Sequence, residues 1–203
     1  YGWFFGFGYF ITNLYWISIS LTFDQSFKYL IPITIFLIPA FLSIFYGLIS
    51  YFFIIFKSKK LISSFFTFVL CFSVLEFVRG SIFTGFPWNL IAYSFSSQLE
   101  ILSVITIIGT YGFNLFCISL FTSPALFIFR KNKINMSIPI FFIIALVLFY
   151  NFGATYKKKF NTSVQKTYEY KVRAIGSNIS LDRFYSSKDP VLVIEDLIKI
   201  SKP

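Results

Sequence analysis

The sequence has 203 residues, and its apolar content is too high for a water-soluble domain. Hydrophobic residues make up 57% of the chain and aromatic residues 23%, whereas soluble domains are about 45–50% apolar even when glycine is counted. The formal net charge is +10 and histidine is absent, which excludes imidazole chemistry within this sequence. The basic residues stand in short clusters between apolar runs, a pattern that encodes membrane topology. The composition therefore predicts a polytopic α-helical membrane protein with no nucleic-acid partner.

Five apolar segments follow one another along the chain, and we expect each of them to cross the roughly 30 Å hydrocarbon core of a bilayer as a helix. The expected helices are 3–21, 30–56, 61–83, 99–129 and 134–151, within a transmembrane domain of residues 1–156. The first segment carries Gly2, Gly6 and Gly8, and small residues at this spacing favour close helix packing. Because the sequence begins at Tyr1 inside an apolar run, we expect a fragment of a longer protein.

Two clusters of basic residues predict the orientation in the membrane. One cluster separates the second and third segments, and the other separates the fourth and fifth. The clusters are Lys57, Lys59 and Lys60, and Arg130, Lys131 and Lys133. Both fall on the same side of the membrane, which the positive-inside rule makes the cytoplasm. The uncharged loop 85–98 and all residues after about 152 then lie on the opposite side.

The long apolar runs end after the fifth segment, and the sequence pattern becomes that of a water-soluble domain. Residues 170–179 partly alternate and end in Gly176-Ser177-Asn178, which predicts a strand that runs into a turn. Residues 189–201 then predict an amphipathic helix, with Asp189 as its N-cap and Pro190 at its first position. A strand, a loop and a helix in this order begin an α/β domain. We therefore expect a truncated α/β domain over residues 167–203.

The stretch LEFVRGSIFTGFPWNL, residues 75–90, places two opposite charges inside an apolar helix. Glu76 and Arg79 are three residues apart and therefore share one helix face. Exposing either charge to lipid would cost at least about 2.5–3.5 kcal/mol, so the two side chains must face protein or a wet cavity. Two interpretations remain open, namely an ion pair that locks helices together and a pair that shapes a polar pocket around a lipid headgroup.

The same stretch ends in TGFPWN, residues 84–89, where glycine and proline break the helix. Trp88 has an amphipathic ring suited to the membrane interface. This segment is either an interfacial turn with an aromatic anchor or an element that lines a substrate site. Tyr93 follows among uncharged polar residues that suit a surface touching both lipid and protein.

From residue 76 to residue 94 the sequence resembles the apolipoprotein N-acyltransferase family of the bacterial inner membrane. That family carries a pattern close to E-x-x-R-G-x-x-x-T-G-F-P-W, followed by Y-S. The residues that fit it are Glu76, Arg79, Gly80, Thr84, Gly85, Phe86, Pro87, Trp88, Tyr93 and Ser94. GWFFGFGYF resembles the family's glycine-rich aromatic run. VRAIGSNIS resembles the first strand of its nitrilase-like domain, although Gly176 replaces a usual glutamine.

The resemblance implies eight membrane helices and a periplasmic nitrilase-like domain of αββα architecture. It also implies a reaction in which a cysteine takes an acyl chain from a phospholipid as a thioester, and then passes it to the α-amine of a lipid-modified N-terminal cysteine of an apolipoprotein. In the family a Glu-Lys-Cys triad performs this chemistry and lies beyond Pro203, so we assign no catalytic residue, cofactor or metal ligand here. Cys71 and Cys117 lie in apolar helices and are predicted to be packing residues.

By the same resemblance, one set of residues is expected to bind the phospholipid acyl donor and the apolipoprotein N-terminus. The set is Glu76, Arg79, Thr84, Gly85, Phe86, Pro87, Trp88 and Tyr93. Two other interpretations compete with the acyltransferase, namely a transporter subunit and a non-catalytic membrane scaffold with an extracytoplasmic domain. Buried charges and broken helices occur in transporters too, but the sequence shows no internal repeat.

Overall fold

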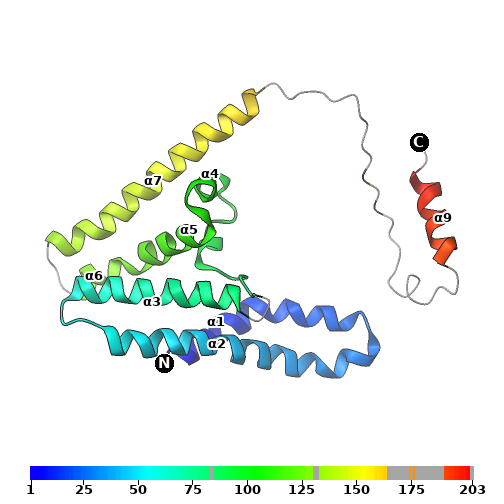
Figure 1. Ribbon diagram of the computed structural model, residues 1–203, viewed down its shortest axis with the longest axis horizontal. Coiled ribbons are helices and arrows are strands. Elements are labelled where there is room, and N and C mark those ends of the chain that lie inside the picture. The colour runs from blue at the N-terminus through cyan, green and yellow to red at the C-terminus, as the bar shows by residue number, and fades with distance from the viewer. Residues whose placement is uncertain (83–84, 130–132, 164–173, 175, 177–189, 202–203) are drawn as a thin grey trace. The chain divides into compact units, whose positions relative to one another are not determined.

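The computed structural model describes residues 1–82, 85–129, 133–163, 174, 176 and 190–201. The chain divides into two units, Tyr1–Ser163 and Val164–Pro203. The described part is helical, and no strand is assigned within it. Within the described residues, five helical stretches are long and apolar enough to cross a membrane (Figure 1), as the sequence predicts: Gly2–Thr22, Gln25–Phe56, Leu61–Ser81, Ile105–Phe129 and Asn135–Thr162.

The first three spans lie side by side (Figure 1). Helix α1 (Gly2–Leu14) continues into 3-10 turns η1 (Tyr15–Thr22) and η2 (Gln25–Leu30), and α2 (Ile31–Phe56) returns along it. Helix α3 (Leu61–Ser81) follows after a connection of four residues and packs against α2. Their shared core is apolar, with Phe10, Leu42, Tyr46, Val69 and Phe72 among its buried residues.

Glycine permits the close approach of α1 to α2. A Cβ atom on Gly2 or Gly6 would come within 3 Å of α2 side chains, at Ser50 and Tyr46 respectively, whereas a Cβ on Gly8 would meet nothing within 4 Å. Two of the three glycines predicted to pack helices therefore do so.

The remaining helices form a second core. The segment expected as one helix over 99–129 is divided into α4 (Leu99–Leu102), α5 (Ile105–Thr122) and α6 (Pro124–Phe129). Helix α5 is itself kinked at Gly109, which has a φ of +73° that residues with a side chain rarely adopt. The 3-10 turn η3 (Ile91–Phe95) packs on α5, and Phe113, Phe116 and Cys117 are buried between them and α7 (Lys133–Thr162).

Helix α7 runs well past residue 151, where the sequence predicts the fifth segment to end. Its C-terminal part packs against α4, where Lys157 Nζ donates to Glu100 Oε1 at 2.7 Å. A Cβ on Gly153 would lie 1.8 Å from the Glu100 carbonyl oxygen, so the contact requires glycine. Apolarity marks where a helix lies in lipid, but it does not mark where the helix ends.

In the second unit the structure describes α9 (Pro190–Ser201), which coincides with the helix expected over 189–201. Val191, Ile194, Leu197 and Ile198 are exposed on it. The predicted strand over 170–179 lies outside the described residues except for Ala174 and Gly176, and Asp189 lies outside them as well.

Candidate functional site

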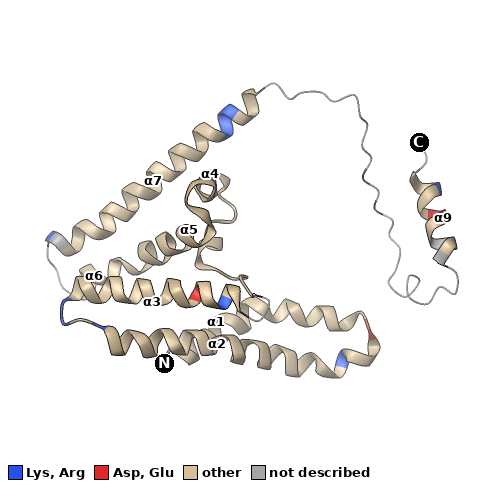
Figure 2. Cartoon of the chain, in the orientation of Figure 1, with Lys and Arg blue, Asp and Glu red and all other residues tan. Residues whose placement is uncertain are grey.

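Glu76 and Arg79 form a buried ion pair one turn from the end of α3, where Figure 2 shows an acidic and a basic position close together. Arg79 Nη2 donates to Glu76 Oε1 at 3.0 Å and to Oε2 at 3.1 Å, and each residue is 1% exposed. The spacing of three residues on one helix brings the two groups together, as the sequence predicts. Taking both charges out of water carries a large desolvation cost, which this close geometry and further hydrogen bonds must offset.

Arg79 uses its other terminal nitrogen to hold the loop that follows α3. Nη1 donates to the carbonyl oxygens of Phe86 at 2.8 Å and Trp88 at 2.9 Å, and the Phe86 N–H donates back to the Arg79 carbonyl at 3.1 Å. The guanidinium therefore satisfies two loop carbonyls next to Pro87, a residue that has no N–H of its own. Arg79 thus joins the ion pair to residues 86–88 of the TGFPWN stretch, called the FPW segment below.

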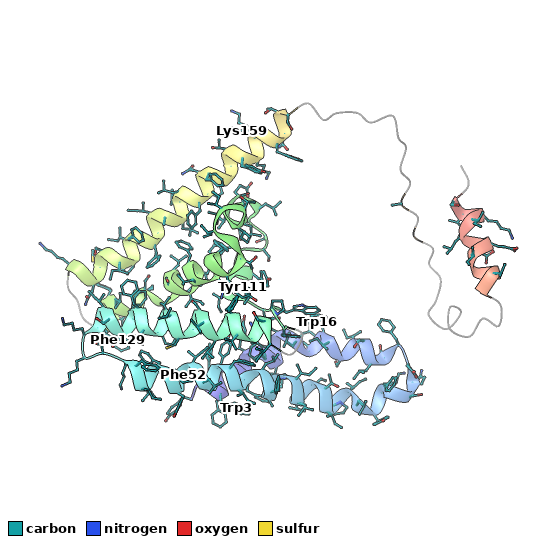
Figure 3. All side chains as sticks on the ribbon, in the orientation of Figure 1. Trp3, Trp16, Phe52, Tyr111, Phe129 and Lys159 are labelled. Carbon is teal, nitrogen blue, oxygen red and sulfur yellow. The ribbon has the colours of Figure 1, made fainter. Side chains whose placement is uncertain are left out.

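Two glycines allow the loop to fold back on α3. Gly85 has a φ of +81°, and a Cβ there would lie 2.5 Å from the Gly80 carbonyl oxygen. A Cβ on Gly80 would lie 1.9 Å from the hydroxyl of Tyr111, which extends from α5 toward α3 (Figure 3). The glycines of the RG and TG pairs thus have a steric role. Thr84 lies outside the described residues, so its predicted part in the site stays a prediction.

Residues from three other helices enclose the ion pair. The Phe10 ring of α1 lies 5.3 Å from the guanidinium carbon of Arg79, a cation–π distance. The Tyr46 hydroxyl of α2 and the Asn114 amide of α5 face the Glu76 carboxylate. The Tyr46 oxygen and the Asn114 nitrogen are buried without a hydrogen bond of ordinary geometry to another described residue. The carboxylate is therefore surrounded by dipoles as well as by its arginine.

Two further hydrogen bonds fix the loop beyond Trp88. The Tyr9 hydroxyl donates to the Asn89 carbonyl at 2.9 Å, and the Ala92 N–H donates to Asn114 Oδ1 at 3.0 Å. Asn89 has a φ of +59°, which asparagine tolerates better than most residues. The sequence did not predict Tyr9 and Asn114 as part of this site. The one available signal for Asn114 is an amide in the middle of an apolar helix.

Apolar crevices lie on both sides of Phe86. One, of about 500 Å³, lies between α2 and the end of α3, and its walls include Leu37, Phe41, Arg79 and Phe86. The other, also about 500 Å³, has Phe86 and Trp88 on one side and η1 residues on the other. Glu76 is 1% exposed and lines neither crevice, whereas its partner Arg79 lines the first one.

Aromatic rings build the second crevice. The Trp88 ring is stacked on Trp16 with 5.1 Å between centroids, and on Phe86 with 5.6 Å. Figure 3 labels Trp16 near the end of α3. Trp88 is 48% exposed, so about half of its surface remains accessible despite the two stacked rings. Long apolar walls and a half-exposed amphipathic ring suit the acyl chain and interfacial region of a lipid.

The predicted residue Tyr93 lies apart from the crevices. It lines a third hollow of about 420 Å³ together with polar side chains of Tyr9, Asn13, Asn89 and Ser94. Pro87 lies against the Gly80 backbone, inside the loop rather than at a crevice wall. The structure therefore brings Arg79, Gly85, Phe86 and Trp88 to the crevices, while Tyr93 faces a more polar space.

These features define a polytopic membrane protein in which the loop after α3 is tethered to a buried ion pair beside lipid-sized apolar crevices. Residues 1–123 match the family model described as the apolipoprotein N-acyltransferase N-terminal domain, and the chain belongs to that family. No solved structure matches the chain.

Three curated relatives illustrate the similarity, and all are named apolipoprotein N-acyltransferase. The protein of Brucella melitensis is 34% identical over 141 residues, covering 68% of this chain and 26% of the relative. That of Rhodopseudomonas palustris is 34% identical over 129 residues, covering 63% and 24%. That of Rickettsia bellii is 37% identical over 123 residues, covering 60% and 24%. The matched region thus spans about a quarter of the length of these relatives.

Proposed function

We propose that the chain forms the membrane part of an apolipoprotein N-acyltransferase and helps to hold both of its lipid substrates. The donor is a phospholipid, and the acceptor is the lipid-modified N-terminus of an apolipoprotein. The membership of residues 1–123 in the family carries this proposal, and the names of the relatives support it. The apolar crevices beside Phe86 and Trp88 give the donor a place to bind.

The residues of the site have different roles in this proposal. Phe86 and Trp88 contact an acyl chain or the headgroup region, because their rings form the crevice walls. Arg79 positions them by holding their carbonyl oxygens, and Glu76 compensates the charge of Arg79. Tyr93 and its polar neighbours offer hydrogen bonds to a headgroup or to the acceptor peptide.

The proposed reaction needs a nucleophile outside the described helices. Cys117 is fully buried among apolar side chains and Cys71 lies within α3, so neither suits attack on a lipid ester. We propose that a Glu-Lys-Cys triad in a nitrilase-like domain performs the chemistry. In this arrangement the protein lies in the bacterial inner membrane, with residues 167–203 on the periplasmic side.

The experiment is an acyl-transfer assay on the protein expressed from its complete native reading frame. A phospholipid labelled in its acyl chain is the donor, and a diacylglyceryl lipopeptide with a free amine is the acceptor. We expect transfer by the wild type and a loss of about tenfold or more in Trp88→Ala, because misplacing a bound substrate costs up to about a hundredfold. Phe141→Ala, which removes an exposed ring from α7, is the matched control and should retain the rate.

The outcomes separate the function from the role of the site. No transfer by correctly folded wild-type protein would contradict the acyltransferase function. Normal transfer by Trp88→Ala would leave that function standing and would remove Trp88 from the substrate site.

A further inference from the structure

Another apolar cleft lies at the opposite end of α3 from the loop described above. Its volume is about 410 Å³, within the range of about 300–1,000 Å³ that ligand sites occupy. The walls come from the end of α2, the first turns of α3, the end of α5 and α6. They include Phe53, Leu61, Phe65, Leu126 and Phe129, of which Phe129 is labelled in Figure 3.

The connection between α2 and α3, which is blue in Figure 2, carries three exposed lysines and leads directly into Leu61 of the cleft wall. They are Lys57, Lys59 and Lys60. The connection is held in a defined shape, since the Ser64 hydroxyl donates to the Ser58 carbonyl at 2.5 Å and the Lys60 N–H donates to the Ser58 hydroxyl at 3.2 Å. Ser64 also lines the cleft. Positive charge is therefore presented at the edge of an apolar space.

The sequence supplies no carboxylate near these lysines along the helices that form the cleft. No acidic residue occurs between Asp24 and Glu76, which covers α2 and residues 61–75 of α3, or between Glu100 and Glu169, which covers α5 and α6. We therefore expect any anion that pairs with these lysines to come from outside these helices. A phosphate that carries acyl chains satisfies both the charge and the apolar walls.

We propose that this cleft binds an anionic phospholipid, with an acyl chain between α3 and α6 and its phosphate at the three lysines. The site is separate from the proposed substrate site, because the ends of the 21-residue α3 are about 30 Å apart. One lipid cannot contact both loops. The bound lipid joins α6 to the α2–α3 pair at this end of the bundle, where direct helix contacts leave the cleft open.

The experiment is native mass spectrometry of the whole chain in detergent, with phosphatidylglycerol and phosphatidylcholine of the same acyl chains offered together. We expect one retained phosphatidylglycerol per chain and little phosphatidylcholine. Lys57→Gln/Lys59→Gln/Lys60→Gln should lower phosphatidylglycerol retention about a hundredfold, which is the factor that three basic residues at about 1 kcal/mol each near a lipid surface correspond to. Lys157→Gln/Lys158→Gln/Lys159→Gln makes the same change of charge elsewhere and should retain the lipid.

The two lysine variants and a cleft-filling variant together test whether phosphatidylglycerol binds at this cleft. Equal loss in both lysine triples, or no loss in the first, would overturn the proposal. Ala125→Phe fills the cleft from α6 without changing the charge, and it should abolish retention of phosphatidylglycerol. Unchanged retention in Ala125→Phe would also overturn the proposal. Soluble glycerol phosphate should not displace the lipid, and displacement at equal concentration would show that the lysines bind free phosphate instead.

Discussion

Arg79 is the residue on which the geometry of the loop depends. One of its nitrogens neutralises Glu76, and the other holds two carbonyl oxygens of the FPW segment. A buried pair adds little net stability over apolar residues, but removing one partner leaves the other charge uncompensated. We therefore interpret the role of the ion pair as positioning the loop.

We expect removal of one charge of the pair to lower the free energy of unfolding more than removal of both charges. Glu76→Gln keeps the shape of the side chain but leaves Arg79 unpaired, so we expect a loss of about 3–5 kcal/mol in the free energy of unfolding. Glu76→Gln/Arg79→Met removes both charges and should recover part of that loss. Unfolding in detergent, followed by circular dichroism, measures both variants. A Glu76→Gln protein as stable as the wild type would show that the pair is not energetically coupled.

The pairing of Glu76 with Arg79 could be predicted from their spacing, because it is local to one helix. The donation from Arg79 to the loop could not, since it depends on how the chain turns at Gly85. Tyr9 and Asn114 approach the loop from helices distant in sequence. Neither contact follows from any pattern within a single segment.

At the scale of elements, the contact between α1 and α2 offers a matched pair of substitutions. A Cβ on Gly6 would lie 2.7 Å from the Tyr46 Cβ, whereas Gly8 faces open space. We expect Gly6→Ala to lower the free energy of unfolding by about 1–3 kcal/mol through overpacking. Gly8→Ala should be neutral or stabilising, because alanine favours the helix. Thermal unfolding in detergent compares the two, and equal midpoints would contradict close packing at Gly6.

The contact between α4 and α7 should depend on pH. The hydrogen bond from Lys157 holds the pKa of the Glu100 carboxyl below its ordinary value. A lowered pKa means that the pair stabilises the contact above the ordinary pKa of about 4.3, and that this contribution is lost as the pH falls through the lowered pKa.

Hydrogen exchange of the α4 amides, corrected for the intrinsic effect of pH, measures this dependence. Protection in the wild type should fall as the pH is lowered from about 5 to about 3. Lys157→Gln, which removes the partner, should show a smaller change. The same acid-induced loss in both proteins would contradict the assignment to this ion pair.

The number of membrane-spanning helices could be predicted from apolar runs, but their interruptions could not. The run 99–129 contains breaks at Gly109 and before Pro124, and neither residue reduces its apolarity enough to mark a boundary. Helix α7 extends to Thr162 because polar residues can continue a helix beyond the bilayer. Hydropathy reports the environment of a segment, whereas helix ends depend on backbone geometry.

At the scale of the whole molecule, the orientation predicted from the lysine clusters can be tested by labelling. Ser96 lies in the loop 85–98 and Ser58 lies in the α2–α3 connection, and both are exposed. With a membrane-impermeant maleimide, Ser96→Cys should react in spheroplasts, and Ser58→Cys should react only after permeabilisation. The wild type measures the background from Cys71 and Cys117. The reverse pattern would place the loop on the cytoplasmic side.

If the ion pair and the FPW loop form a lipid-binding site, the indole of Trp88 can report lipid binding directly. Trp3→Phe/Trp16→Phe leaves Trp88 as the single tryptophan of the chain. Phospholipid with a brominated acyl chain is titrated into the detergent-solubilised protein while the tryptophan fluorescence is followed. We expect saturable quenching that unbrominated phospholipid reverses and that Arg79→Ala weakens. Quenching that rises linearly, and equally in Arg79→Ala, would contradict lipid binding at this site.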